Sequence, residues 1–127
     1  MKTALILLDY IVEITHPNGK LASKGYADFV TKNNTIFKLN KTLEQARKDG
    51  KTIIFVNLGF AQDYSDHPQH SPVLGAAAAN GILKQGTPST ELHPDIRTKP
   101  SDLFITKTRV SGFSSPELVE TLQNHNI

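Results

Sequence analysis

The sequence predicts an α/β fold, in which helices cover both faces of a parallel sheet. Two short apolar runs, residues 3–8 and 52–58, have the length and composition of buried strands. Between them, apolar residues in the range 36–46 recur at spacings of three, four and three, which is the period of a helix with one buried face. A strand, a helix and a strand in this order predict a right-handed βαβ unit with parallel strands.

Each element of the unit has its own boundary signals. The first run, TALILL, ends at Asp9, and turn residues follow in the segment 17–19. Residues 26–30 are expected to form a helical turn. The longer helix begins near Asn34 and ends before Gly50, because glycine suits the position that follows a helix. Its predicted buried face consists of Ile36, Leu39, Leu43 and Ala46.

The remainder of the chain is less regular. Residues 59–98 are rich in proline and glycine, and only residues 74–83 could contain a short helix. A segment this long is often functional, so we expect it to line a pocket or a subunit interface. A third strand is predicted over 102–106, reaching Lys107, and a helix is predicted to begin at Ser115-Pro116.

Length and composition narrow the classes of function. The chain has 127 residues, which fits a single domain over 1–127, and its net charge is only +2. The lysines are scattered, so we expect no nucleic-acid binding. No apolar stretch reaches the roughly 20 residues of a membrane span, and no cleavage site follows the N-terminal apolar run. The expectation is a cytoplasmic protein without membrane contact. The absence of cysteine excludes disulfides and thiolate metal sites within these residues.

Polar residues stand where the predicted strands end. Asp9 ends the first strand, Asn57 lies near the end of the second, and Lys107 ends the third. Because ligands of open α/β sheets bind beyond the carboxyl ends of the strands, these side chains are candidates for a site. A carboxylate there could act as a general base, and a lysine could hold an anion. The alternative is that the charges only mark where strands leave the core, and the pattern does not decide between the two.

Several segments resemble the isochorismatase-like cysteine hydrolase family. ALILLDY is similar to the strand that delivers the family's catalytic aspartate, and ITKTRVSGF is similar to its K-x-R-x-S-x-F segment. GKTIIFVNLGF and SSPELVETLQNHNI follow the family's order of elements. The resemblance covers nearly the whole chain and implies a Rossmann-like, three-layer α/β/α fold. By this likeness the chain corresponds to the N-terminal two-thirds of the domain, holds only its first strands, and is truncated at its C-terminus.

The resemblance also implies a mechanism. The family uses an Asp-Lys-Cys triad, so Asp9 would accept the thiol proton and Lys107 would stabilise the thiolate and the charged intermediate. The cysteine would lie beyond Ile127, so these 127 residues alone are expected to be inactive. The implied substrate is a small amide- or isochorismate-like molecule. The family's frequent D-x-Q pattern is absent after Asp9. The alternative is a non-catalytic, oligomeric binding or scaffold protein of the same fold.

Four further residues are expected at the substrate pocket. Tyr10 and Phe60 follow strand ends and could stack on a flat substrate, although packing is an equal alternative. His93 could shape the pocket or face solvent, and Phe113 fits the family pattern. His67 and His70 have ligand-like spacing only on a helix, which Pro68 disfavours, so no metal site is expected. The sequence contains no GxGxxG or P-loop, so no nucleotide cofactor is expected. The expected partners are a small-molecule substrate and, as is common in the family, further copies in a homo-oligomer.

Overall fold

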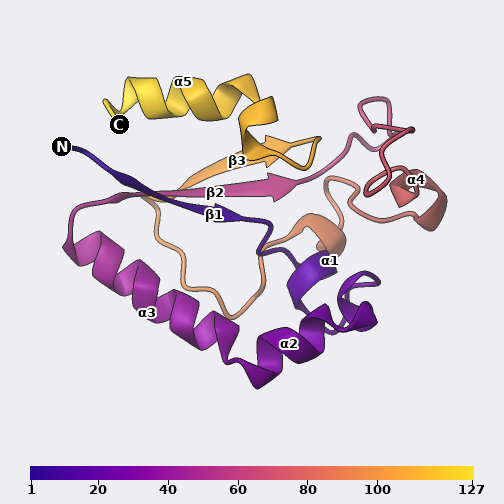
Figure 1. Cartoon of the computed structure of the whole chain (residues 1–127), viewed down its shortest axis with the longest axis horizontal. Coiled ribbons are helices and arrows are strands. Elements are labelled where there is room, and N and C mark those ends of the chain that lie inside the picture. Colours follow the sequence, from indigo (N-terminus) through magenta and orange to yellow (C-terminus); the bar gives the residue numbers. More distant parts are fainter.

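A parallel sheet of three strands forms the centre of the computed structural model, which describes residues 1–127 (Figure 1). The strands are β1 (Ala4–Leu8), β2 (Thr52–Leu58) and β3 (Leu103–Lys107), and their order in the sheet is β1-β2-β3. Leu7 pairs with Phe55, and Phe55 pairs with Phe104, so these three side chains lie side by side on one face of the sheet. The predicted α/β class and parallel strands are confirmed.

Helices lie on both faces of the sheet (Figure 1). The α-helices are α1 (Val12–Thr15), α2 (Tyr26–Lys32), α3 (Thr35–Lys48), α4 (Ala77–Asn80) and α5 (Pro116–Asn124). Short 3₁₀ turns are η1 (Ala22–Lys24), η2 (Pro88–Thr90) and η3 (Gly112–Ser114). The predicted helices correspond to α2, α3, α4 and α5. The single turn of α1 was not predicted, because four residues are too few to show a helical period.

The longest helix, α3, covers one face of the sheet. Its predicted apolar stripe is buried against Leu7, Ile53 and Phe55. Gly50 follows the helix with φ 69°, a left-handed conformation that glycine adopts without strain. Ile96, from the segment that leads into β3, joins the same cluster, so the connection from β2 to β3 also returns on the α3 face.

The opposite face of the sheet carries α5. Leu118 of this helix packs on Ile54, Val56 and Ile105, all of which are buried. Pro116 occupies the first turn, as predicted, but the side chain of Ser115 makes no capping hydrogen bond. The two helices α3 and α5 therefore sandwich the sheet, which gives the three layers that Figure 1 shows from the edge.

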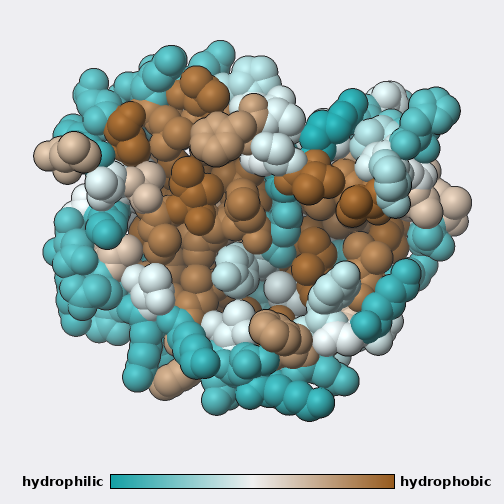
Figure 2. Space-filling model, viewed as in Figure 1, coloured by the Kyte–Doolittle hydropathy of each residue, from teal (hydrophilic) through white to brown (hydrophobic).

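The first strand differs from its prediction, because it is not buried on both faces. Only Leu7 of β1 is buried, and Leu8 is 50% exposed. The physical reason is the strand order: β1 has a neighbour, β2, on one side only. Figure 2 shows the result as a hydrophobic surface between α5 and α3, where Figure 1 places β1. No helix of the chain combines the length and the apolar character that crossing a membrane would need.

Candidate functional site

Asp9 and Lys107 meet at the carboxyl end of the sheet. Lys107 Nζ lies 2.9 Å from Asp9 Oδ2, and the two side chains are 1% and 22% exposed. The residues are 98 positions apart in sequence, and only the parallel pairing of β1 and β3 with β2 brings them to the same rim. The side chain of Lys107 is buried, whereas that of Asp9 keeps partial access to solvent.

The backbone of Asp9 takes an unusual conformation. Its φ is 61°, in the left-handed region that few non-glycine residues adopt, and aspartate is one of the more tolerant. The Asp9 N–H still donates to Val56 O at 3.0 Å, as in a parallel ladder. The next N–H of β2, that of Leu58, donates to Asp9 Oδ1 at 3.0 Å. The carboxylate therefore continues the ladder in place of a main-chain oxygen, which fixes its orientation.

The ammonium group of Lys107 has a second partner. It donates a hydrogen bond to Val110 O, in the turn between β3 and η3. Asp9 Oδ1 accepts a backbone N–H, and Oδ2 is the oxygen that faces the cation. A fixed carboxylate can accept a proton, and the buried cation beside it can stabilise a neighbouring anion.

Asn57, the third residue of the predicted rim, lies between the other two strands at the end of β2. Its Oδ1 atom is buried and has no hydrogen-bond partner. The residue lines a hollow of about 310 Å³ together with Gly59, Thr90 and Phe104. Buried amide oxygens are nearly always hydrogen-bonded, so this atom is an acceptor available to a ligand or an ordered water.

A backbone hydrogen bond joins His93 to Tyr10, the residue that follows Asp9. The His93 N–H donates to Tyr10 O at 2.9 Å, and the ring Nδ1 accepts the Asp95 N–H at 3.1 Å. Burial lowers the pKa of His93 and the nearby His16 lowers it further, whereas Asp95 opposes both effects. The His93 ring is 7% exposed and lies 5.2 Å from the ring of His16, so it is an interior group and does not face solvent.

The two predicted phenylalanines lie in opposite environments. Phe60 is fully buried, with its ring against those of Tyr64 and His67. Its ring offers no surface to a substrate, so its placement favours packing, the alternative left open by the sequence. Phe113 is 66% exposed on η3. Of the predicted pocket residues, Phe113 and the partly buried Tyr10 therefore keep surface for a contact, and Phe60 does not.

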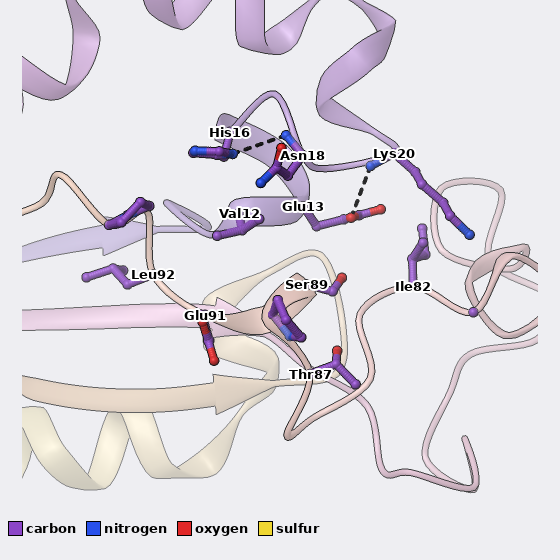
Figure 3. A pocket seen from close by; sticks show the side chains of 13 residues that line it. Val12, Glu13, His16, Asn18, Lys20, Ile82, Thr87, Ser89, Glu91 and Leu92 are labelled. Carbon is purple, nitrogen blue, oxygen red and sulfur yellow. Dashed lines mark hydrogen bonds between the residues drawn. The ribbon is translucent and has the colours of Figure 1, made fainter.

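A second hollow lies between α1 and η2 and was not predicted. It measures about 430 Å³ and is lined mainly by polar residues, including Glu13, His16 and Ser89. Glu13 is buried, and its carboxylate accepts the Lys20 N–H at 3.2 Å (Figure 3). The carboxylate thus fixes the loop after α1. Neither Asp9 nor Lys107 lines this hollow.

The histidines of the middle loop do not form a metal cluster. His67 Nε2 lies 2.8 Å from Leu74 O, in a hydrogen bond within the loop. No three histidine, aspartate or glutamate side chains come together in an arrangement that could hold a metal ion. The buried carboxylate of Glu13 and the buried ring of His67 are instead tied to nearby backbone groups.

Known proteins resemble this arrangement over the whole chain. The sequence model of the isochorismatase domain matches residues 3–127. The ureidoacrylate amidohydrolase RutB of Rhizobium rhizogenes is 25% identical over an alignment of 138 positions, which covers 99% of this chain and 56% of that protein. The chain thus spans little more than half the length of this curated relative.

Solved structures show the same fold. An isochorismatase family protein from Desulfovibrio vulgaris superposes with a TM-score of 0.80 at 20% identity, covering 99% of this chain and 63% of that one. An N-carbamoylsarcosine amidase from Thermoplasma acidophilum gives a TM-score of 0.70 at 24% identity, covering 100% of this chain and 64% of that one. These structures share the layered sheet of Figure 1.

Proposed function

Because the chain belongs to the isochorismatase domain family, we propose that it supplies the acid–base half of a hydrolase site. Asp9 is the general base, and Lys107 is the cation that stabilises negative charge. The nucleophile is a cysteine outside these 127 residues, which contain none. The observation that carries the proposal is the 2.9 Å contact between the buried ammonium and a fixed, partly accessible carboxylate at the carboxyl ends of the strands.

The proposed substrate is a small molecule with an amide or ureide bond. Two similar proteins are named as an amidohydrolase of ureidoacrylate and an amidase of N-carbamoylsarcosine, and both names denote cleavage of a carbon–nitrogen bond. An isochorismate-like vinyl ether is the second substrate class that the family resemblance allows. The exposed ring of Phe113 and the partly buried Tyr10 are the proposed contacts for the substrate.

In the proposed reaction, Asp9 Oδ2 takes the proton of the cysteine thiol and the thiolate attacks the carbonyl carbon. The Lys107 ammonium stabilises the negative charge that develops. The protonated Asp9 then gives its proton to the departing nitrogen, and a thioester with the cysteine remains. Water attacks the thioester, Asp9 accepts the proton of that water, and the thiol leaves reprotonated. The hydrogen bond from Leu58 N–H keeps Asp9 oriented through both halves of this sequence.

The topology of the sheet supports a position for the nucleophile beside Asp9. The connections from β1 to β2 and from β2 to β3 run on the α3 face, and the sheet grows from β1 toward β3. The helix α5 lies on the other face. Parallel crossovers are right-handed in about 98% of cases. A connection that passes over the α5 face must therefore move across the sheet from β3 toward β1, opposite to the two connections on the α3 face. A strand reached from α5 would therefore pair with the free edge of β1, and its carboxyl end would lie beside Asp9.

The test uses a chain extended by the residues encoded after Ile127. We expect release of ammonia from ureides or simple carboxamides, carried by a cysteine at a strand-to-helix turn. D9N should lower kcat by about 10³-fold or more, on the scale of a lost general base and charge partner. D28N, which makes the same change at an exposed position of α2, is the matched control.

Two results would contradict the proposal. The first is an extension without a cysteine, and the second is D9N activity equal to that of D28N. In either case the alternative function, a non-catalytic binding or scaffold protein, would be favoured. The 127-residue chain alone is expected to give no turnover in the same assay.

A further inference from the structure

A basic hollow lies beside α3, and neither Asp9 nor Lys107 lines it. It measures about 480 Å³, it lies between the second half of α3 and the segment 97–99, and none of its lining residues is hydrophobic. Four cationic side chains line it, namely Arg47, Lys48, Arg97 and Lys99. We call this feature the basic hollow.

The cations of the basic hollow are only partly neutralised. Arg47 pairs with Asp102 at 2.5 Å, and Lys48 pairs with Glu44 at 3.1 Å. The side chains of Arg97 and Lys99 have neither a hydrogen-bond nor an ion-pair partner. These four cations and two carboxylates leave a local charge of +2 (4 − 2).

Two further observations describe the charged groups at this place. Arg47 Nε is buried without an acceptor, and Oδ1 of its ion-pair partner Asp102 is buried without a donor. Lys48 chiefly, with smaller contributions from Arg97 and Lys99, lowers the pKa of Glu44. The cations of residues 97–99 and Lys48 of α3 therefore act on the same carboxylate, that of Glu44.

The segment that carries the free cations is fixed through its backbone. Asn40 holds it at two points, because its Nδ2 donates to Asp95 O and its Oδ1 accepts the Arg97 N–H, each at 2.9 Å. Arg47 donates to Arg97 O at 3.1 Å, and Asp102 accepts the Lys99 N–H at 2.8 Å. A fixed backbone reduces the entropy that binding must overcome, so Arg97 and Lys99 are presented to a ligand in advance.

We propose that the basic hollow binds a small dianionic oxyanion, either free phosphate or the phosphate group of a monoester. The charge of such a ligand matches the local charge of +2. The Arg97 guanidinium can donate two parallel hydrogen bonds to a phosphate, and Lys99 and the Thr98 hydroxyl can supply further donors. The absence of hydrophobic lining disfavours a flat apolar ligand. The site does not depend on the proposed hydrolase function.

The experiment is an NMR titration of the full chain with inorganic phosphate and, separately, with glycerol phosphate, against sodium chloride at equal ionic strength. We expect saturable shifts concentrated on the backbone N–H groups of residues 97–99. R97Q/K99Q should raise the dissociation constant by about tenfold or more, the scale of two lost charge-assisted contacts. Both side chains are exposed and the backbone contacts remain, so the variant should fold.

The control variant K24Q/K32Q removes the same charge from exposed positions outside the basic hollow. It should change the dissociation constant by less than about twofold, because a general charge effect is screened by salt. Equal weakening in both variants, or shifts spread over all the lysines, would overturn the proposal. Tighter binding of glycerol phosphate than of phosphate would support a phosphorylated metabolite as the ligand, and the reverse order would support free phosphate.

Discussion

Two buried ion pairs stand at opposite ends of the same sheet. Asp9 and Lys107 lie at the carboxyl ends of the strands, and Arg47 and Asp102 link α3 to the residue before β3. In each pair one side chain is 1% exposed and its partner is partly accessible. The difference lies in which group is sealed, because the pair at the strand ends buries the cation and the other pair buries the carboxylate.

The chemistry of the cation separates their roles. A guanidinium stays charged in proteins, whereas a lysine amine can give up its proton when its surroundings change. Asp102 is also tied to the Lys99 N–H, and Arg47 to Arg97 O, so this pair joins two segments into one unit. The side chain of Asp9 keeps partial access to solvent beside its cation. Both pairs hold backbone groups through both partners, since Leu58 N–H donates to Asp9 and Lys107 donates to Val110 O. They differ in which partner keeps access to solvent, and the proposed reactivity rests on the partly accessible carboxylate of Asp9.

A large stability effect should follow from D102N. The change leaves the Arg47 guanidinium facing a neutral amide in a largely buried site, and breaking a buried pair typically costs about 3 kcal/mol of unfolding free energy. Urea unfolding followed by circular dichroism measures the loss. A loss equal to that of an exposed change, such as D28N, would show that this pair has no structural role.

A loss of about the same size, about 3 kcal/mol, is expected from D9N, because the change leaves the buried Lys107 ammonium facing a neutral amide. Asparagine can still accept the Leu58 N–H and tolerates the left-handed conformation, so the backbone at this position should be kept. Urea unfolding measures the loss, and a value equal to that of D28N would show that Lys107 does not need the charge of Asp9.

The smallest effect concerns His93, whose backbone holds Tyr10 next to Asp9. Because burial lowers its pKa in the folded state, the unfolded state binds the proton first as the pH falls below the ordinary value of 6.5. The folded state should thus lose stability between pH 6.5 and the lowered pKa. H93Q should remove this acid sensitivity, a smaller effect than the loss in either carboxylate variant. Unfolding free energies at pH 7.5 and pH 5.5 measure it, and an unchanged pH slope in H93Q would count against the assignment.

Local sequence signals were sufficient for most of the fold. The apolar runs predicted three strands within about one residue of their observed bounds, and the helical period identified all four residues that α3 buries. The residues Asp9 and Lys107 were also chosen correctly as strand ends, and the structure brings them together. Their roles in catalysis stay predictions. These successes share a cause, since each signal is carried by the element itself.

The failures concern contacts between distant segments. The exposure of β1 depends on how many neighbours the strand has, which its own residues do not reveal. For Phe60 the sequence left packing and substrate contact open, and the choice depends on the loop of residues 64–83, which folds over the ring and buries it. The pair of Arg47 and Asp102 joins residues 55 positions apart, and Arg47 alone looked like an ordinary basic residue in the last turn of a helix. Only the packed structure reveals such pairs.

We propose that Asp9 and Lys107, the ion pair at the strand ends, are the reactive pair. The most direct measurement compares ammonia release per folded molecule for D9N and D102N in the chain extended beyond Ile127. The account predicts that D9N loses about 10³-fold in kcat while it remains largely folded, and that D102N keeps kcat within about threefold for the molecules that remain folded. Full activity in D9N, or loss of kcat in folded D102N alone, would contradict it.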